Sequence, residues 1–192
     1  MKTVIITGGN SGLGYEAAKN FALDGKWHIV IASRNKKRLS EAVAQLKNET
    51  GYAHISSLVL DLASFASVRE FVTQFAQASL PPLHGIVCNA GLTTTWTKTV
   101  DGIDTTFGVN HLGHFLLVNL LLKYLQTPAR IIFVSSGTHL PETRSARWLG
   151  VPSPKYVTAR DLAYPDLAPE QAKLTNPRHA YSTSKLCNVL CA

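Results

Sequence analysis

The sequence has few cysteines and no long apolar run, and each of these two shortages excludes a class of protein. Its three cysteines, Cys88, Cys187 and Cys191, are too few for a disulfide scaffold and lack zinc-like pairing, so reduced thiols are expected. The longest strongly apolar stretch, 115–125, falls far short of the ~20 apolar residues of a membrane-spanning helix. The N-terminus runs directly into a strand pattern without a signal-peptide h-region, so a cytoplasmic protein is expected.

Acidic residues are also scarce relative to basic ones, with 12 Asp and Glu against 19 Lys and Arg. A net charge of +7 would suit a nucleic-acid-binding protein or a protein that holds a polyanionic cofactor. The chain has no basic stripe with interleaved aromatic residues, so nucleic acid is not an expected partner. With 192 residues, 45% of them hydrophobic, it suits one domain with a real core and is too short for two.

Strand and helix patterns alternate along the chain from its first residue. Buried apolar runs predict strands, and segments with apolar residues at helical spacing predict helices between them. The alternation predicts an α/β fold: a Rossmann-like doubly wound parallel sheet with helices on both faces, in a single domain over residues 1–192. The predicted strands are 2–7, 27–32, 55–60, 85–89 and 130–135, and the predicted helices after the first are 37–48, 65–78, 101–125 and 179–192.

The regular pattern stops after the fifth strand. Segment 137–178 holds six of the nine prolines and is predicted to be a long loop insertion before the last helix. It follows the carboxyl edge of the sheet, where ligands of such folds bind, so a lid over the substrate cleft is the favoured interpretation. A sheet of this kind normally continues after such a helix, so the last strands are expected to be missing from this chain. The apolar residues that the segment could bury are Trp148, Leu149, Val151, Tyr156 and Tyr164.

A glycine-rich turn joins the first predicted strand to the first predicted helix. Glycines let the backbone turn sharply and let a pyrophosphate approach the amides, and the helix N-terminus adds a positive dipole end. The spacing is G-x3-G-x-G and no G-K-[ST] follows, which excludes a triphosphate P-loop. The turn therefore predicts a dinucleotide phosphate site formed by Thr7, Gly8, Asn10, Ser11, Gly12, Leu13 and Gly14.

The end of the second predicted strand distinguishes between the two nicotinamide cofactors. A fold specific for NAD places an acid there to hold the ribose 2′-hydroxyl, and this chain has none. Arg34 offers a guanidinium and Ser33 a hydroxyl donor, which together suit a 2′-phosphate. NADP(H) is therefore the predicted cofactor, whereas 36–38 is interpreted as a solvated helix start.

Six motifs in this order resemble the short-chain dehydrogenase/reductase family. Some phrases, such as 110–115 and 181–188, look like the branch that contains retinol dehydrogenases and light-dependent protochlorophyllide reductases. The resemblance covers the whole chain and implies hydride transfer between a nicotinamide and a carbonyl or alcohol. The motifs are Thr7–Gly14, Asp61-Leu62, Asn89-Ala90-Gly91, Asn110, Ser135-Ser136 and Tyr181-Ser182-Thr183-Ser184-Lys185.

The resemblance assigns catalytic roles. Tyr181 would protonate the carbonyl oxygen, and Lys185, one helical turn away, would lower the usual tyrosine pKa of ~10. Ser136 would bond the substrate oxygen in preference to Ser135, because side chains alternate along a strand. Asn110 would hold a water that relays the proton.

The resemblance also implies cofactor contacts beyond the first turn. Lys185 would hold the nicotinamide ribose, and Asp61 would contact the adenine ring, with a helix-start residue as its alternative. The remaining cofactor residues implied at this stage are Leu62, Asn89, Ala90, Gly91 and Tyr181.

Several other residues receive more ordinary interpretations. Tyr15 begins a second Y-x-x-x-K in the phosphate-binding helix, which is interpreted as a decoy. His111 and His114 are expected on the polar or interface face of the long helix. Cys88 and Cys187 are expected to be buried packing thiols.

Three functions remain open. The first is an NADPH-dependent reductase or dehydrogenase of a small carbonyl or alcohol substrate, which could be apolar. The second is protochlorophyllide-type C=C reduction, distinguished by a need for light. The third is a cofactor-binding protein without turnover, or an inactive fragment. Family members form dimers through the helices that would carry Asn110 and Tyr181, so the long insertion is expected to favour a monomer.

Overall fold

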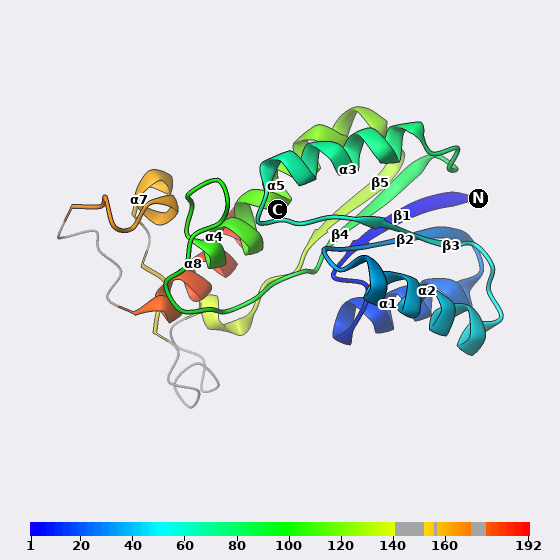
Figure 1. Cartoon of the computed structure of the whole chain (residues 1–192), viewed down its shortest axis with the longest axis horizontal. Helices are drawn as coiled ribbons and strands as arrows, with labels where there is room; N and C mark the ends of the chain where they lie inside the picture. The colour runs from blue at the N-terminus through cyan, green and yellow to red at the C-terminus, as the bar shows by residue number, and fades with distance from the viewer. Residues whose placement is uncertain (141–151, 156, 170–175) are drawn as a thin grey trace.

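Five parallel strands form one sheet in the order β3-β2-β1-β4-β5 in this computed structural model, which describes residues 1–140, 152–155, 157–169 and 176–192 (Figure 1). Helices cover both faces, so the inner strands are buried on both sides and read as nearly continuous apolar runs. The predicted doubly wound α/β fold is confirmed. The strands are β1 Lys2–Thr7, β2 Trp27–Ser33, β3 Ile55–Val59, β4 Leu83–Cys88 and β5 Leu125–Phe133.

Two helix pairs form the outer layers. α1 (Gly12–Asp24) and α2 (Lys36–Thr50) cover one face of the sheet, and α3 (Phe65–Gln77) and α5 (Gly113–Leu121) cover the other (Figure 1). Ser64 is the N-cap of α3, since its side chain accepts a hydrogen bond from the backbone N–H of Ser67. Each helix pair packs on the sheet through its own hydrophobic cluster, so both layers contribute to the core.

The long helix predicted over 101–125 begins later than expected and is not uniform. Asp101 instead accepts a hydrogen bond from Phe65 N at 2.8 Å, and Asp104 caps the first turn by accepting from Phe107 N at 2.8 Å. A 3-10 turn, Leu122–Tyr124, ends the helix, so β5 starts at Leu125 rather than at residue 130. The helical run consists of α4 (Thr105–Phe107), a π-helical turn (Gly108–Leu112), α5 and this 3-10 turn.

The segment before the last helix is not all loop. It contains a 3-10 turn (Gly137–His139) and helix α7 (Ala159–Ala163), and it leads into α8 (Pro177–Leu190). α7 lies beside α4 and α8 beyond the carboxyl ends of the strands (Figure 1). Four of the five apolar residues singled out in this segment, Trp148, Leu149, Val151 and Tyr156, lie outside the described residues.

No helix in the described part of the chain combines the length and the apolar composition that crossing a bilayer requires.

Candidate active site

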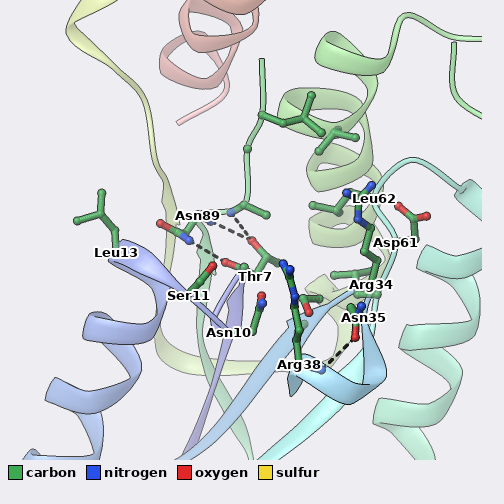
Figure 2. A pocket seen from close by; sticks show the side chains of 18 residues that line it. Thr7, Asn10, Ser11, Leu13, Arg34, Asn35, Arg38, Asp61, Leu62 and Asn89 are labelled. Carbon is green, nitrogen blue, oxygen red and sulfur yellow. Dashed lines mark hydrogen bonds between the residues drawn. The ribbon is translucent and has the colours of Figure 1, made fainter. Parts of the chain in front are cut away.

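A cavity of about 450 Å³ opens at the carboxyl ends of the strands, where the strand order changes direction between β1 and β4 (Figure 2). It collects most of the predicted cofactor residues, but Gly12, Gly14, Tyr181 and Lys185 do not line it. Its lining consists of Thr7, Gly8, Asn10, Ser11, Leu13, Ala32, Ser33, Arg34, Asn35, Arg38, Leu60, Asp61, Leu62, Asn89, Ala90, Gly91, Leu92 and Val109.

The glycine-rich turn brings the N-terminus of α1 close to this cavity. A Cβ at Gly14 would lie 2.4 Å from Gly8 O and 2.6 Å from Asn89 Nδ2, so only glycine permits this approach. Ser11, the N-cap residue of α1, makes no side-chain cap, and no acid lies in the first turn. The helix N-terminus therefore keeps its positive end available for an anion.

The adenosine side of the cavity carries basic and hydroxyl groups. Ser33 Oγ is buried without a hydrogen-bond partner in the part of the chain that the structure describes. Arg34 and Arg38 both extend into the cavity from the end of β2 and the start of α2 (Figure 2). Arg38, in the first turn of α2, is exposed as expected for a solvated helix start and also lines the cavity, so it suits a helix start and a ligand role alike.

A threonine hydroxyl joins the two sides of the strand switch point. Thr7 Oγ1 accepts hydrogen bonds from Asn89 N at 2.9 Å and Ala90 N at 3.0 Å. Asn89 Nδ2 donates in return to Thr7 O at 3.0 Å. Asp61 lines the cavity and also accepts from Ala63 N at 2.9 Å, as a residue near a helix start can; its contact with an adenine ring stays a prediction.

A second group of predicted residues lies beyond the cavity, on α8. Lys185 is only 4% exposed, its Nζ donates to Val134 O at 3.0 Å, and it lies 5.7 Å from the ring centroid of Tyr181. Burial lowers the pKa of this lysine. A Cβ at Gly91 would lie 3.4 Å from Lys185 Nζ and 3.3 Å from Asn110 Oδ1. Gly91 therefore connects the cavity to the Lys185 ammonium.

The two serines after β5 have different partners. Ser135 Oγ donates to Lys185 O at 2.8 Å, which directs it toward α8. Ser136 Oγ only accepts a long contact of 3.4 Å from Thr138 N. In the described part of the chain the hydroxyl proton of Ser136 has no acceptor, whereas that of Ser135 is engaged by Lys185 O; the preference for Ser136 stays a prediction.

Asn110 lies in the π-helical turn, where Gly113 N bonds to Gly108 O five residues back. Gly108 and Gly113 bound this turn, which is of a type common at functional sites. The Asn110 carboxamide is fully buried: Oδ1 accepts from Leu92 N at 2.8 Å, and Nδ2 donates to Leu92 O at 2.9 Å and to Ser184 at 3.2 Å. A relay water could be held only by Oδ1, because both amide protons are engaged.

The two helix histidines, expected on a polar or interface face, are both buried, so neither lies on an exposed polar face. His114 is fully buried and contacts Thr7 Oγ1 through Nε2 at 2.8 Å. His111 is also buried and pairs with Asn188 at 2.9 Å. Asn188 Nδ2 donates in turn to Asn110 O at 3.2 Å, and sequence reasoning missed it. The available signal was its position three residues after Lys185 on the same helix face.

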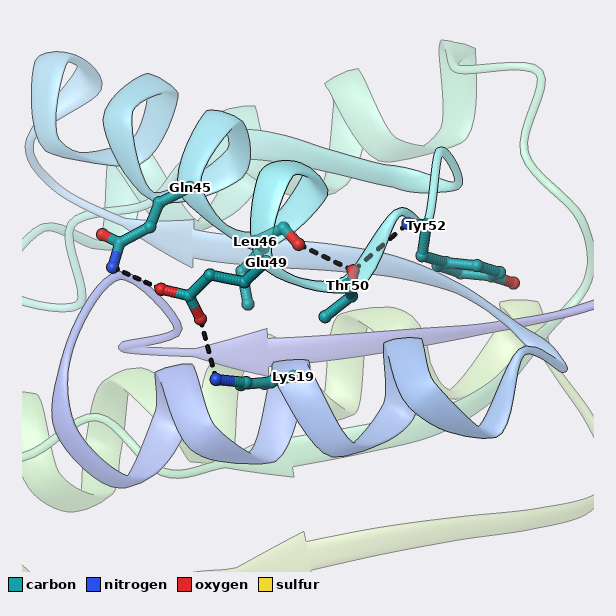
Figure 3. Close-up of polar contacts among 6 residues, drawn as sticks. All are labelled: Lys19, Gln45, Leu46, Glu49, Thr50 and Tyr52. Atoms are coloured by element: carbon teal, nitrogen blue, oxygen red, sulfur yellow. Dashed lines mark hydrogen bonds and ion pairs between the residues drawn. The ribbon is translucent and has the colours of Figure 1, made fainter.

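The thiols and the second Y-x-x-x-K follow the sequence interpretation. Burial raises the pKa of Cys88 to about 12 and that of Cys187 to about 11, as packing thiols should show. Lys19 pairs with Glu49 at 2.9 Å on the outer side of α1 and α2 (Figure 3). Burial raises the pKa of Tyr15, the reverse of what a catalytic tyrosine needs.

Within the described ranges, no three histidine, cysteine or acidic side chains gather as a group that could hold a metal ion.

The chain is similar to known proteins in sequence and in fold. The family model for short chain dehydrogenase matches residues 2–145. The chain is 42% identical over 196 residues to the WW domain-containing oxidoreductase of Homo sapiens, covering 98% of this chain and 43% of that protein. It is 38% identical over 205 residues to retinol dehydrogenase 14 of Homo sapiens, covering 98% and 54%.

Solved structures give the same fold. A short-chain dehydrogenase from Sphingobium yanoikuyae in complex with NADPH has a TM-score of 0.66 at 21% identity, covering 100% of this chain and 63% of that chain. This chain spans about half the length of the curated relatives that it matches. It belongs to the short-chain dehydrogenase family and resembles the retinol dehydrogenases within it.

Proposed function

We propose that this chain forms the cofactor-binding and catalytic part of an NADP(H)-dependent oxidoreductase that acts on a carbonyl or alcohol. The observation that carries the cofactor assignment is the buried, unpartnered Ser33 Oγ beside Arg34, at a strand end without an acid. A buried hydroxyl without a partner is costly unless a ligand satisfies it, and a 2′-phosphate would do so. The NADPH complex of the Sphingobium yanoikuyae enzyme supports the same choice.

We expect the cofactor to be held at three places. Arg34 and Arg38 would hold the 2′-phosphate, and the N-terminus of α1 would hold the pyrophosphate. Gly91 would admit the nicotinamide end toward Lys185. When bound, NADPH supplies the hydride.

The protein's own groups would move the proton. The Tyr181 hydroxyl has no hydrogen-bond partner among the described residues, and the Lys185 ammonium lies one helical turn away, over its ring. A tyrosine hydroxyl can give its proton to a reduced carbonyl oxygen, so Tyr181 would act as the general acid. Ser136 would donate to the same oxygen and orient it.

Cofactor preference is the first test. Replacing Arg34 by Leu should weaken NADPH binding about tenfold or more while changing NADH binding little, because a charge-assisted contact to phosphate is lost. Lys37→Leu, at an exposed position that does not line the cavity, is the matched control. Calorimetric titration of both cofactors measures the difference. Equal affinity of the unmodified chain for NADPH and NADH would contradict the assignment.

Turnover separates the three functions left open by the sequence. The full-length protein should oxidise retinol, the alcohol named for its relative, in the dark, and Tyr181→Phe should abolish this while NADPH affinity is retained. Tyr15→Phe should leave turnover nearly unchanged. A strict need for light would favour C=C reduction, and cofactor binding without any turnover would favour a non-catalytic protein.

A further inference from the structure

A buried histidine bridges two parts of the site that lie far apart in sequence. His114 Nε2 lies 2.8 Å from Thr7 Oγ1, and its Nδ1 lies 3.3 Å from Asn110 O. Thr7 holds the amides of Asn89 and Ala90, which line the cofactor cavity. The Asn110 side chain bonds to the backbone N–H and carbonyl of Leu92, two residues after Ala90. His114 therefore links, through Thr7 and Asn110, the two groups of hydrogen bonds that hold the 89–92 segment.

The partners of His114 determine which ring nitrogen carries the proton. A carbonyl oxygen only accepts, so the contact with Asn110 O requires a proton on Nδ1. A neutral ring then leaves Nε2 as an acceptor, and Thr7 Oγ1 donates to it. This fits Thr7, whose oxygen lone pairs already accept two backbone amides, while its alternative acceptor, Val87 O, is farther away at 3.3 Å.

Steric contact reinforces the same junction. His114 follows Gly113, where a Cβ would lie 2.5 Å from Leu62 O, so the helix packs directly on a backbone that lines the cavity. His114 is fully buried and its ring has no room to turn toward water. The position of the ring is thus set by the fold, and the ring can transmit the position of one element to the other.

We propose that His114 is a positioning residue: its neutral, Nδ1-protonated ring holds the Asn89–Ala90 turn in register with the Asn110 turn, and so sets the cofactor cavity against the catalytic helix. The consequence for cofactor affinity rests on the proposed function. The hydrogen-bond partners of the ring are Thr7 and Asn110, so it would act on the cofactor through these two residues.

Three substitutions separate the two hydrogen bonds. His114→Gln can place a carboxamide oxygen near the Nε2 position and accept from Thr7. His114→Asn can place an amide N–H near the Nδ1 position and donate to Asn110 O. His114→Phe keeps a ring of similar size and loses both. His111→Phe is the matched control, since this buried histidine contacts Asn188 and not Thr7.

The first two measurements use the chain without cofactor. Nitrogen-15 NMR should show His114 protonated on Nδ1 and not on Nε2. Amide exchange at Asn89 and Ala90 should accelerate about tenfold in His114→Phe and much less in His114→Gln, with no change in His111→Phe. A proton on Nε2, or unchanged exchange in His114→Phe, would overturn the inference whether or not the chain binds NADPH.

The third measurement tests the consequence for the cofactor. NADPH should bind His114→Phe about three- to tenfold more weakly, as expected for the loss of the one bond, that to Thr7, that reaches the cofactor cavity, with rescue by Gln rather than Asn. A merely stabilising role would lower the urea midpoint of His114→Phe and leave the NADPH affinity of the folded chain unchanged, which would also overturn the inference. If the unmodified chain fails to bind NADPH, the proposed function fails, and the NMR and exchange results still decide the role of His114.

Discussion

Mild acid should destabilise the folded chain through His114. The ring is fully buried, and burial lowers its pKa from 6.5 to about 4. The unfolded chain therefore binds a proton at a pH where the folded chain does not. A depressed folded-state pKa means that stability is fully present above the unfolded value of 6.5 and is lost as pH falls toward 4.

The size of this effect follows from proton linkage. At about pH 5.5 the unfolded state has taken up most of its proton and the folded state almost none, which costs about 1.4 kcal/mol relative to about pH 7.5. The full loss, below the folded pKa, is about 3 kcal/mol. The cost at pH 5.5 changes little for any folded pKa below about 5, because the unfolded state supplies nearly all of the proton uptake.

Urea unfolding at the two pH values measures this cost. The loss of unfolding free energy between about pH 7.5 and pH 5.5 should be smaller by about 1.4 kcal/mol in His114→Phe than in the unmodified chain. Other buried groups cancel in this difference: the lowered pKa of His28 and His111 acts in the same direction as that of His114, and the raised pKa of Asp104 acts against it. Equal pH dependence in the unmodified and His114→Phe chains would refute the reasoning.

Three further changes test the packing around the site. Burial lowers the pKa of Lys185, so its buried charge costs stability at neutral pH, and this cost falls only once pH rises through the folded pKa. Lys185→Met should therefore unfold at an equal or higher urea midpoint at neutral pH, and a lower midpoint would contradict this. Gly113→Ala should lose about 1 kcal/mol or more in urea unfolding, because contact with Leu62 O at 2.5 Å outweighs the ~1 kcal/mol helix preference of alanine; a more stable variant would refute the clash. Leu162→Ala, at 2% exposure, should cost about 2–4 kcal/mol in thermal or urea unfolding, whereas Leu167→Ala, at 70% exposure, should stay within about 0.5 kcal/mol; equal effects would show that α7 is not packed.

The fold was predictable because its signals are local. Apolar runs, helical periodicity and the glycine-rich turn each lie within one element, and together they imply the parallel sheet. Element boundaries depended on contacts that no local pattern shows. The long helix starts late because Asp101 caps the neighbouring α3 through Phe65 N, a residue 36 positions away.

The candidate site was predictable where it follows strand ends. Thr7, Arg34, Asp61 and Asn89 lie at or within two residues of the carboxyl ends of strands that meet at one edge, so the fold alone brings them together. The contact between Thr7 and His114 spans 107 positions and joins two residues without a shared motif. Only the packed structure reveals such a pair, because it depends on how closely the helix lies on the sheet.

The described part of the segment before α8 packs against α8, the helix that carries Tyr181 and Lys185. The lid and monomer roles of this segment both remain predictions. Its described part is anchored mainly by burial: Leu162 and Ala163 pack with Ala180 and Cys187 of α8 in one hydrophobic cluster. The Lys98–Asp166 ion pair at 2.7 Å is half exposed, so it contributes little beside that burial.

Two hydrogen bonds from backbone groups of this segment extend the anchoring to the start of α4 and to α8. Ala163 O accepts from Asp104 N at 2.8 Å, at the start of the helix that carries Asn110. Lys155 N donates to Thr183 Oγ1 at 3.1 Å, between Tyr181 and Lys185. A segment held in this way stabilises the position of Tyr181 and Lys185 whether or not it also covers a substrate. Deleting it would therefore change turnover through α8 as well as through a lid, and point substitutions at Leu162 separate these effects better than deletion does.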